Sequence, residues 1–233
     1  MKTVFVQRFA LVVLAMIFAV TQAHAQSSKV KKPEPLGYSW ADKFLEEIYL
    51  LDVDVETCTK EIDDARYYLA EMAEDPAVFL KEKGTTDFKT VVKISREKFE
   101  QGKAAKKSLD ELFSSSDFNG KLTNLTDQLK QVSDTKSLNA VGKNLKEAVK
   151  NLTAVPKSAD KLGKRAKSIV DRADNVLKQA DQLDMFKKAP VVSALTSNVS
   201  SLKSTAEKMP VLADVSVKTL DLYKKVLTNI KVK

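Results

Sequence analysis

Residues 138–183 have the sequence LNAVGKNLKEAVKNLTAVPKSADKLGKRAKSIVDRADNVLKQADQL, in which every position of an alternating three- and four-residue spacing is apolar. The fourteen positions of this apolar seam are Leu138, Val141, Leu145, Ala148, Leu152, Val155, Ala159, Leu162, Ala166, Ile169, Ala173, Val176, Ala180 and Leu183. This spacing is the heptad a/d pattern of helices that pack lengthwise against one another. It predicts a long amphipathic helix within a helical assembly.

Small side chains occupy one edge of the seam. Alanine takes four consecutive a positions, with leucine, isoleucine or valine at the d positions between them; the alanines are Ala159, Ala166, Ala173 and Ala180. The distance between two packed helix axes depends on the side chains at the contact, so we expect a close, antiparallel helix pair along 159–183. Apolar residues at e positions widen the stripe and favour a bundle over a two-stranded coiled coil; they are Val149, Val170 and Leu177.

The helical period recurs elsewhere in the chain. Apolar residues at three- and four-residue steps predict helices over 44–72 and 88–113, and a second seam over 192–209. No stretch shows the strict alternation of a β-strand. The predicted fold class is therefore all-α, an elongated antiparallel helical bundle of five to seven helices with heptad (coiled-coil-like) packing.

Local signals predict where these helices end. Asp75 precedes Pro76, and a residue before proline is disfavoured in helical conformation, so the first long helix should end there. The segment 114–117 is expected to be a loop whose serines cap the next helix. Proline fits the first helical turn and is costly further in, so three prolines are expected to mark helix starts or kinks: Pro156, Pro190 and Pro210.

The first 25 residues carry the marks of a secretory signal. Lys2 and Arg8 form a basic start, residues 9–20 form an apolar run, and Ala23-His24-Ala25 fits the small-x-small cleavage pattern. An apolar run of twelve residues is too short to span a bilayer, which needs about 20. We expect a cleaved signal peptide over 1–25 and an exported protein, located in the periplasm or outside the cell.

Removal of the signal changes the chemistry that remains. Residues 26–233 contain no histidine and one cysteine, Cys58, with 37 basic side chains against 31 acidic ones. Neither an intrachain disulfide nor a zinc site on histidine or paired cysteines is possible. Cys58 lies on an apolar helical spacing, so we expect a buried thiol, with an intermolecular disulfide as the alternative. No transmembrane segment is expected in this part of the chain.

Charge and aromatic content divide the chain into regions. Residues 26–37 read as a flexible, basic, proline-containing leader, residues 38–113 as an acidic, aromatic-rich helical part, and residues 118–233 as a basic helical part rich in alanine, leucine and valine. The two helical parts are expected to form one continuous bundle. Their opposite charges could attract each other within it, or the basic part could face a partner.

Lysines line the face opposite the apolar seam. The candidate residues for binding an anionic surface are Lys143, Lys150, Lys157, Lys161, Lys164, Arg165, Lys167 and Lys178. A linear cationic face of this kind fits anionic lipid headgroups or an acidic polysaccharide. An ordinary solvated helix face also carries lysine at these positions, so both interpretations stay open. Nucleic acid is not expected as a partner, because the protein is expected to be exported and this half has almost no aromatic residues for base stacking.

Motifs of known catalytic or metal chemistry do not occur. Asp52, Asp54 and Glu56 resemble the start of a calcium loop, but Thr57 stands where such a loop needs glycine, so we interpret them as a solvated helix face. Without histidine, the usual base for a serine or cysteine nucleophile is missing. We therefore predict no catalytic, cofactor-binding or metal-binding residues, no cofactor and no enzymatic activity.

These expectations combine into two functional hypotheses. The first is an exported, non-enzymatic helical bundle that acts as a structural or interaction module, through a protein partner or by self-association along its helical seams. The alternative is an exchangeable amphipathic protein that opens on an anionic lipid surface, or binds an acidic polysaccharide, through its lysine-rich face.

Overall fold

A computed structural model describes residues 30–101 and 108–230 of the chain. Within these ranges the protein consists of seven helices and no strand, so the all-α prediction is confirmed. The helices are α2 (Ser39–Glu74), α3 (Pro76–Lys83), α4 (Phe88–Gln101), α5 (Leu109–Ser114), α6 (Ser116–Gln131), α7 (Thr135–Ala180) and α8 (Met185–Leu227). The signal peptide predicted over 1–25, and residues 26–29 of the leader, lie outside the described residues.

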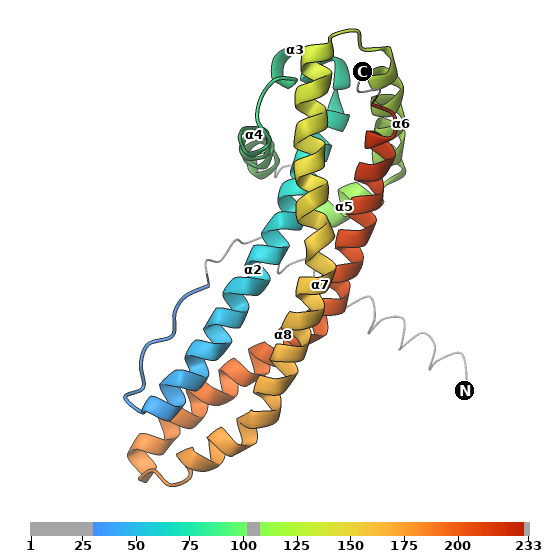
Figure 1. Ribbon diagram of the computed structural model, residues 1–233. Coiled ribbons are helices and arrows are strands. Elements are labelled where there is room, and N and C mark those ends of the chain that lie inside the picture. The colour runs from blue at the N-terminus through green and yellow to red at the C-terminus, as the bar shows by residue number, and fades with distance from the viewer. Residues whose placement is uncertain (1–29, 102–107, 231–233) are drawn as a thin grey trace, which may run out of the picture.

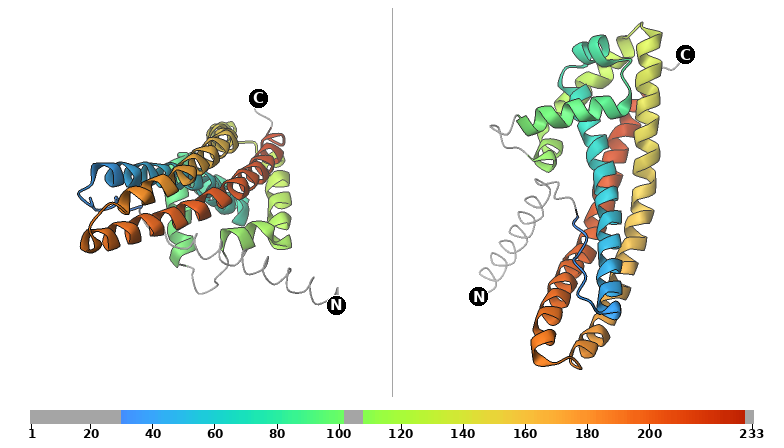
Figure 2. Two further views of the ribbon diagram at one scale, coloured as in Figure 1. Left: turned by 90° about the horizontal axis from the view of Figure 1, so that it is seen from below. Right: turned by 90° about the vertical axis from the view of Figure 1, so that its left-hand side faces the viewer.

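Three long helices form the elongated body of the bundle. α2, α7 and α8 lie side by side along its length, and α7 and α8 make an antiparallel hairpin closed by residues 181–184 (Figures 1 and 2). The shorter helices α3 to α6 gather toward the opposite end of the body, where α7 begins and α8 ends (Figure 1). No helix in the described ranges has both the length and the apolar character needed to cross a membrane.

The apolar seam of 138–183 faces the interior of this bundle. Twelve of its fourteen residues are buried, and Val176 and Leu183 are half-buried. Leu183 lies beyond α7, which ends at Ala180, so the helix stops three residues before the end of the seam. All four alanines of the stripe are buried, as the predicted close pairing of α7 with α8 requires.

The three prolines lie inside helices and not at helix starts; the alternative expectation, that they mark kinks, stays a prediction. α7 begins at the cap residue Asp134, and α8 begins at the cap residue Asp184, whose carboxylate accepts a hydrogen bond from the Lys187 amide at 3.2 Å. Pro156 belongs to α7, while Pro190 and Pro210 belong to α8. At Pro156 the helix persists because the Ser216 hydroxyl replaces the missing backbone donor to the Leu152 carbonyl.

Other helix ends follow the sequence signals, with two exceptions. α2 ends at Glu74, and Asp75 then caps α3 by accepting from the Val78 amide at 3.1 Å. The helix predicted over 88–113 is two helices, because a capping box formed by Ser108 and Glu111 starts α5 as a separate element. Residues 102–107 of that prediction lie outside the described residues. The loop predicted over 114–117 is wrong in extent, because Ser114 ends α5 and Ser116 begins α6, so Ser115 alone lies between the two helices. The predicted cap is confirmed: the Ser115 hydroxyl accepts from the Phe118 amide at 3.1 Å.

The described part of the leader is extended and contacts α2. The Leu36 amide donates to the Asp42 carboxylate at 2.6 Å, and Lys32 lies 3.6 Å from Glu46. Gly37 between them has a φ of 81°, a left-handed conformation that favours glycine over side chains with a Cβ. This turn redirects the chain into α2.

Candidate cationic binding surface

Seven of the eight predicted cationic residues lie exposed on α7; they are Lys143, Lys150, Lys157, Lys161, Lys164, Lys167 and Lys178. α7 is positioned for this by its apolar seam, which turns toward α2 and α8 and leaves the opposite face in solvent. Of these seven lysines, only Lys164 has an ion-pair partner among the described residues, namely Asp160 on the same helix at 2.6 Å. The structure therefore leaves a row of unpaired ammonium groups along α7.

Arg165 differs from the other predicted residues. Its side chain is half-buried, and its Nη1 atom lies 2.9 Å from the Oδ2 atom of Asp54 on α2. Two turns further along α7, Arg172 donates hydrogen bonds from both terminal guanidinium nitrogens to the carboxylate of Glu47, which also lies on α2. This hydrogen bonding raises the pKa of the Arg172 guanidinium. The two arginines of this region thus join α7 to α2, whereas the lysines face outward.

The acidic cluster of α2 is not simply a solvated face, and that interpretation is corrected here. Asp52 is half-buried and accepts a hydrogen bond from Thr205 of α8 at 3.4 Å, while Asp54 pairs with Arg165 of α7. Burial raises the pKa of the Asp52 carboxyl, against the lowering effects of Thr205 and of Lys208. The two acids contact different helices because residues two apart in sequence, such as Asp52 and Asp54, are rotated by about 200° about the helix axis. No cluster of potential metal ligands occurs in the parts of the chain that the structure describes.

Cys58 is buried in the core, as its spacing predicted. Burial raises the pKa of its thiol, and the nearby carboxylates of Glu61 and Asp54 raise it further. A protonated, inaccessible thiol is a poor nucleophile.

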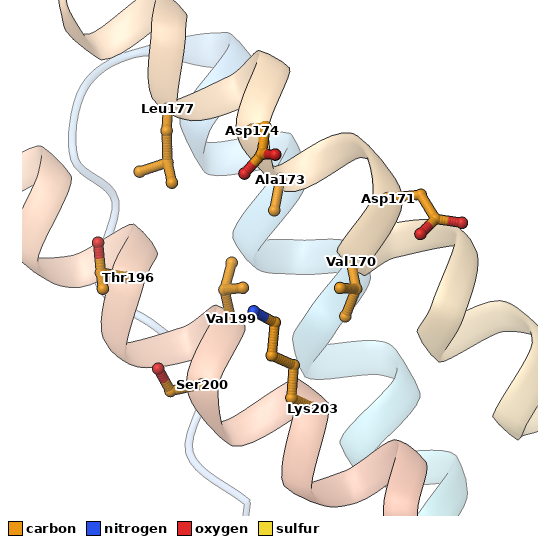
Figure 3. A pocket seen from close by; sticks show the side chains of 9 residues that line it. All are labelled: Val170, Asp171, Ala173, Asp174, Leu177, Thr196, Val199, Ser200 and Lys203. Carbon is orange, nitrogen blue, oxygen red and sulfur yellow. The ribbon is translucent and has the colours of Figure 1, made fainter.

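A surface groove between α7 and α8 was not predicted. It has a volume of about 390 Å³ and lies near the closed end of the hairpin (Figure 3). Ala173 and Leu177 of α7 and Val199 of α8 point into it, and Asp171, Asp174 and Lys203 lie around it (Figure 3). Sequence periodicity assigns Ala173 and Val199 to the buried seams, but it does not reveal where two seams part and leave a hollow.

A second group that sequence analysis missed lies at the other end of the bundle. Glu71 of α2 is nearly buried and pairs with Lys83 of α3 and, at 2.6 Å, with Lys98 of α4. Burial opposes ionisation of Glu71, but the hydrogen bonds from the two lysines outweigh it and lower the pKa of this carboxyl. A glutamate on the buried side of a helix was the one available signal in the sequence. The group joins three helices and has no unsatisfied charge.

Comparison of the chain with protein-family models, with curated proteins and with solved structures gives no match in any of the three.

Proposed function

We propose that this protein is an exported, non-enzymatic interaction module that binds an acidic polysaccharide along the exposed face of α7. The observation that carries the proposal is the row of seven exposed lysines, six of which have no ion-pair partner among the described residues. A linear array of cations on a rigid support raises the local concentration of a linear polyanion.

The dimensions of the row support a polymeric ligand. From Lys143 to Lys167 an α-helix rises about 36 Å, at about 1.5 Å per residue. Lysines that recur every seven residues stand about 10 Å apart along one side of such a helix. A polymer with regularly spaced carboxylate or sulfate groups can follow this line and pair with several lysines at once.

The construction of the bundle argues for binding without opening. A helix that lies in a bilayer inserts its apolar face, but the apolar face of α7 is already covered by α2 and α8. Opening would also break buried hydrogen bonds between helices. These include the bond from the Asn144 side-chain amide to the Tyr68 hydroxyl at 3.2 Å and that from the Tyr223 hydroxyl to the Ala65 carbonyl at 2.6 Å. These features support the polysaccharide over the exchangeable, lipid-bound alternative.

Export and the absence of catalysis rest on the sequence. The basic start, apolar run and small-x-small site of residues 1–25 support secretion. In residues 26–233 there is no histidine to act as a general base at neutral pH, which supports a binding role.

Binding of residues 26–233 to polygalacturonate tests the proposal, with neutral dextran as the control polymer. We expect binding at about 0.05 M salt that is lost at about 0.5 M, since screening weakens contacts between exposed charges. The triple variant Lys143→Gln/Lys150→Gln/Lys157→Gln should bind more weakly and with a smaller salt dependence.

The matched control neutralises three exposed lysines outside α7 that already have acidic partners, Lys130 of α6 and Lys218 and Lys224 of α8. This control should bind the polymer almost as the unmodified protein does. If both triple variants lost the same amount of polymer binding, net charge alone would explain the binding, which would contradict the proposal. Vesicles of anionic phospholipid form a separate arm: binding there with a rise in helicity, and none to the polymer, would favour the lipid alternative.

A further inference from the structure

The closed end of the α7–α8 hairpin carries two large apolar side chains that the bundle does not cover. Met185 is 79% exposed and Phe186 is 90% exposed, more than any other large apolar side chain among the described residues. They are the first two residues of α8, directly after the cap residue Asp184. Exposed apolar groups at such a prominent position are typical of a contact surface.

The groove described above is the matching hollow on the same hairpin. Its volume of about 390 Å³ lies within the range of ligand clefts. Val170, Ala173, Leu177 and Val199 form the apolar part of its lining, beside polar side chains such as Thr196 and Ser200. The Lys203 side chain extends from α8 toward Val199 at one side of this hollow (Figure 3).

The helical repeat places the projecting pair and the groove on one side of the hairpin. Thr196 and Lys203, which line the groove, follow Met185 by 11 and 18 residues. At 3.6 residues per turn these separations are about three and five whole turns, so the three residues share a face of α8. The distance from Met185 to Thr196 along the helix is about 16 Å, at about 1.5 Å per residue.

The charges around the two features are complementary. Lys187 and Lys188 follow Phe186, whereas Asp171 and Asp174 stand on the α7 side of the groove (Figure 3). Among the described residues neither aspartate has an ion-pair partner, while the two lysines are paired only within their own end of the hairpin, with Asp184 and Asp181. A basic apolar projection therefore faces the same way as a groove whose α7 side carries two aspartates, while Lys203 of α8 lines its other side.

We propose that a second copy of this chain occupies the groove. Two hairpins pack antiparallel about a two-fold axis, so that Met185 and Phe186 of each copy lie in the groove of the other and the lysines beside them meet Asp171 and Asp174. In such a pairing one patch serves both copies, because the projection of one always meets the groove of its mate. The proposal goes beyond the polysaccharide-binding function and does not depend on it.

Light scattering and sedimentation of residues 26–233 over a wide concentration range test the pairing. We expect a reversible dimer whose dissociation constant rises at least about tenfold in Met185→Ser/Phe186→Ser, because two buried apolar side chains are lost. The matched control is Val217→Ser, which removes an exposed apolar side chain elsewhere on α8 and should leave the dimer intact. Circular dichroism verifies that each variant keeps its helices.

A charge exchange makes the test specific for this geometry. Variant one, Asp171→Lys/Asp174→Lys, and variant two, Lys187→Glu/Lys188→Glu, should each be monomeric, since like charges then meet at both contacts. An equimolar mixture should restore dimers of the mixed kind only, since opposite charges meet at both contacts again.

Three results would overturn the proposal. The first is a monomeric unmodified protein at the highest concentration measured. The second is a dimer that withstands the serine pair, and the third is a mixture that fails to pair. The protein could also stay monomeric and float with neutral phospholipid vesicles only when Phe186 is present. That result would overturn the pairing and assign Met185 and Phe186 to a membrane contact.

Discussion

Ser216 of α8 donates a hydrogen bond from its hydroxyl to the backbone carbonyl of Leu152 on α7, at 3.0 Å and out of contact with solvent. In an α-helix this carbonyl would accept from the amide four residues later, but that residue is Pro156, which has no N–H. A hydroxyl from the neighbouring helix therefore satisfies the carbonyl that proline leaves without a partner. The bond explains how a 46-residue helix passes through Pro156 without ending.

The first prediction concerns this bond. Ser216→Ala leaves the buried Leu152 carbonyl unsatisfied and should lower the free energy of unfolding by about 1–3 kcal/mol. In a Pro156→Ala background the helix supplies its own amide, so the same serine change should cost clearly less. Chemical denaturation of the four proteins in this double-mutant cycle measures the difference. Equal costs in both backgrounds would show that Ser216 and Pro156 are not coupled.

A second prediction follows from two buried tyrosines. Burial raises the pKa of both Tyr68 and Tyr223 above the ordinary value of 10.0, so the folded protein keeps their protons where the unfolded chain loses them. Their contribution is intact below pH 10, and stability should fall as the pH rises above it, by about 1.4 kcal/mol per pH unit for each tyrosine.

Tyr223→Phe isolates one of these two contributions. At neutral pH it removes the hydrogen bond to the Ala65 carbonyl, at a cost of about 0.5–1.5 kcal/mol. Above pH 10 its stability should decline less steeply than that of the unmodified protein, so the two curves converge. Parallel curves in urea denaturation between pH 9 and 11.5 would mean that Tyr223 ionises normally in the folded state.

The fold is predictable from the sequence to the extent that it depends on periodic burial. The apolar seam, the end of α2 before Asp75 and the cap at Ser115 are local patterns. The end and the cap are confirmed, and twelve of the fourteen seam residues are buried. The position of Pro156 inside α7 is not predictable from local sequence, because it depends on Ser216, 60 residues away in sequence and brought close only when α7 and α8 pair. A local rule cannot include a donor that the tertiary structure brings in.

In the candidate sites, too, the sequence predicts the features that depend on periodic burial but not those that depend on tertiary contacts. Exposure of the α7 lysines follows from the heptad position, because the side opposite a buried seam is solvated. The role of Arg165 does not follow, since its partner Asp54 lies on another helix at a height set by the pairing of α2 with α7. The groove beside Ala173 depends on the local separation of α7 from α8, for which the seam pattern carries no information.

The third prediction concerns acid. Since the pKa of Glu71 is lowered from 4.5 in the folded protein, its contribution to stability is present above pH 4.5 and is lost as the pH falls below this value. Glu71→Gln should cost about 1–3 kcal/mol at pH 7 and progressively less at lower pH, because it removes charged hydrogen bonds that acid also removes. Thermal denaturation from pH 7 to pH 3 measures this convergence.

Lys98→Met is the control for the Glu71 change. The Lys98 side chain is more than half exposed, and Lys83 still pairs with Glu71 when Lys98 is replaced. We expect a cost below that of Glu71→Gln at every pH above 4.5. A larger cost for Lys98→Met would place the stabilising contact elsewhere on α4.

The last prediction compares two alanines of the same stripe. Ala166 is 0% exposed and belongs to the closed core, whereas Ala173, 2% exposed, also lines the open groove. Ala166→Leu must force its extra carbon atoms into filled space and should cost about 1–3 kcal/mol. Ala173→Leu can direct its side chain into the groove, so we expect a smaller cost, and the exposed position Ala154→Leu on α7 should be neutral within about 0.5 kcal/mol. Urea denaturation ranks the three variants. If Ala166→Leu lowered the free energy of unfolding no more than Ala154→Leu does, α7 and α8 would not approach as closely as the buried stripe requires. If Ala173→Leu lowered it the most, the groove would not be open space in solution.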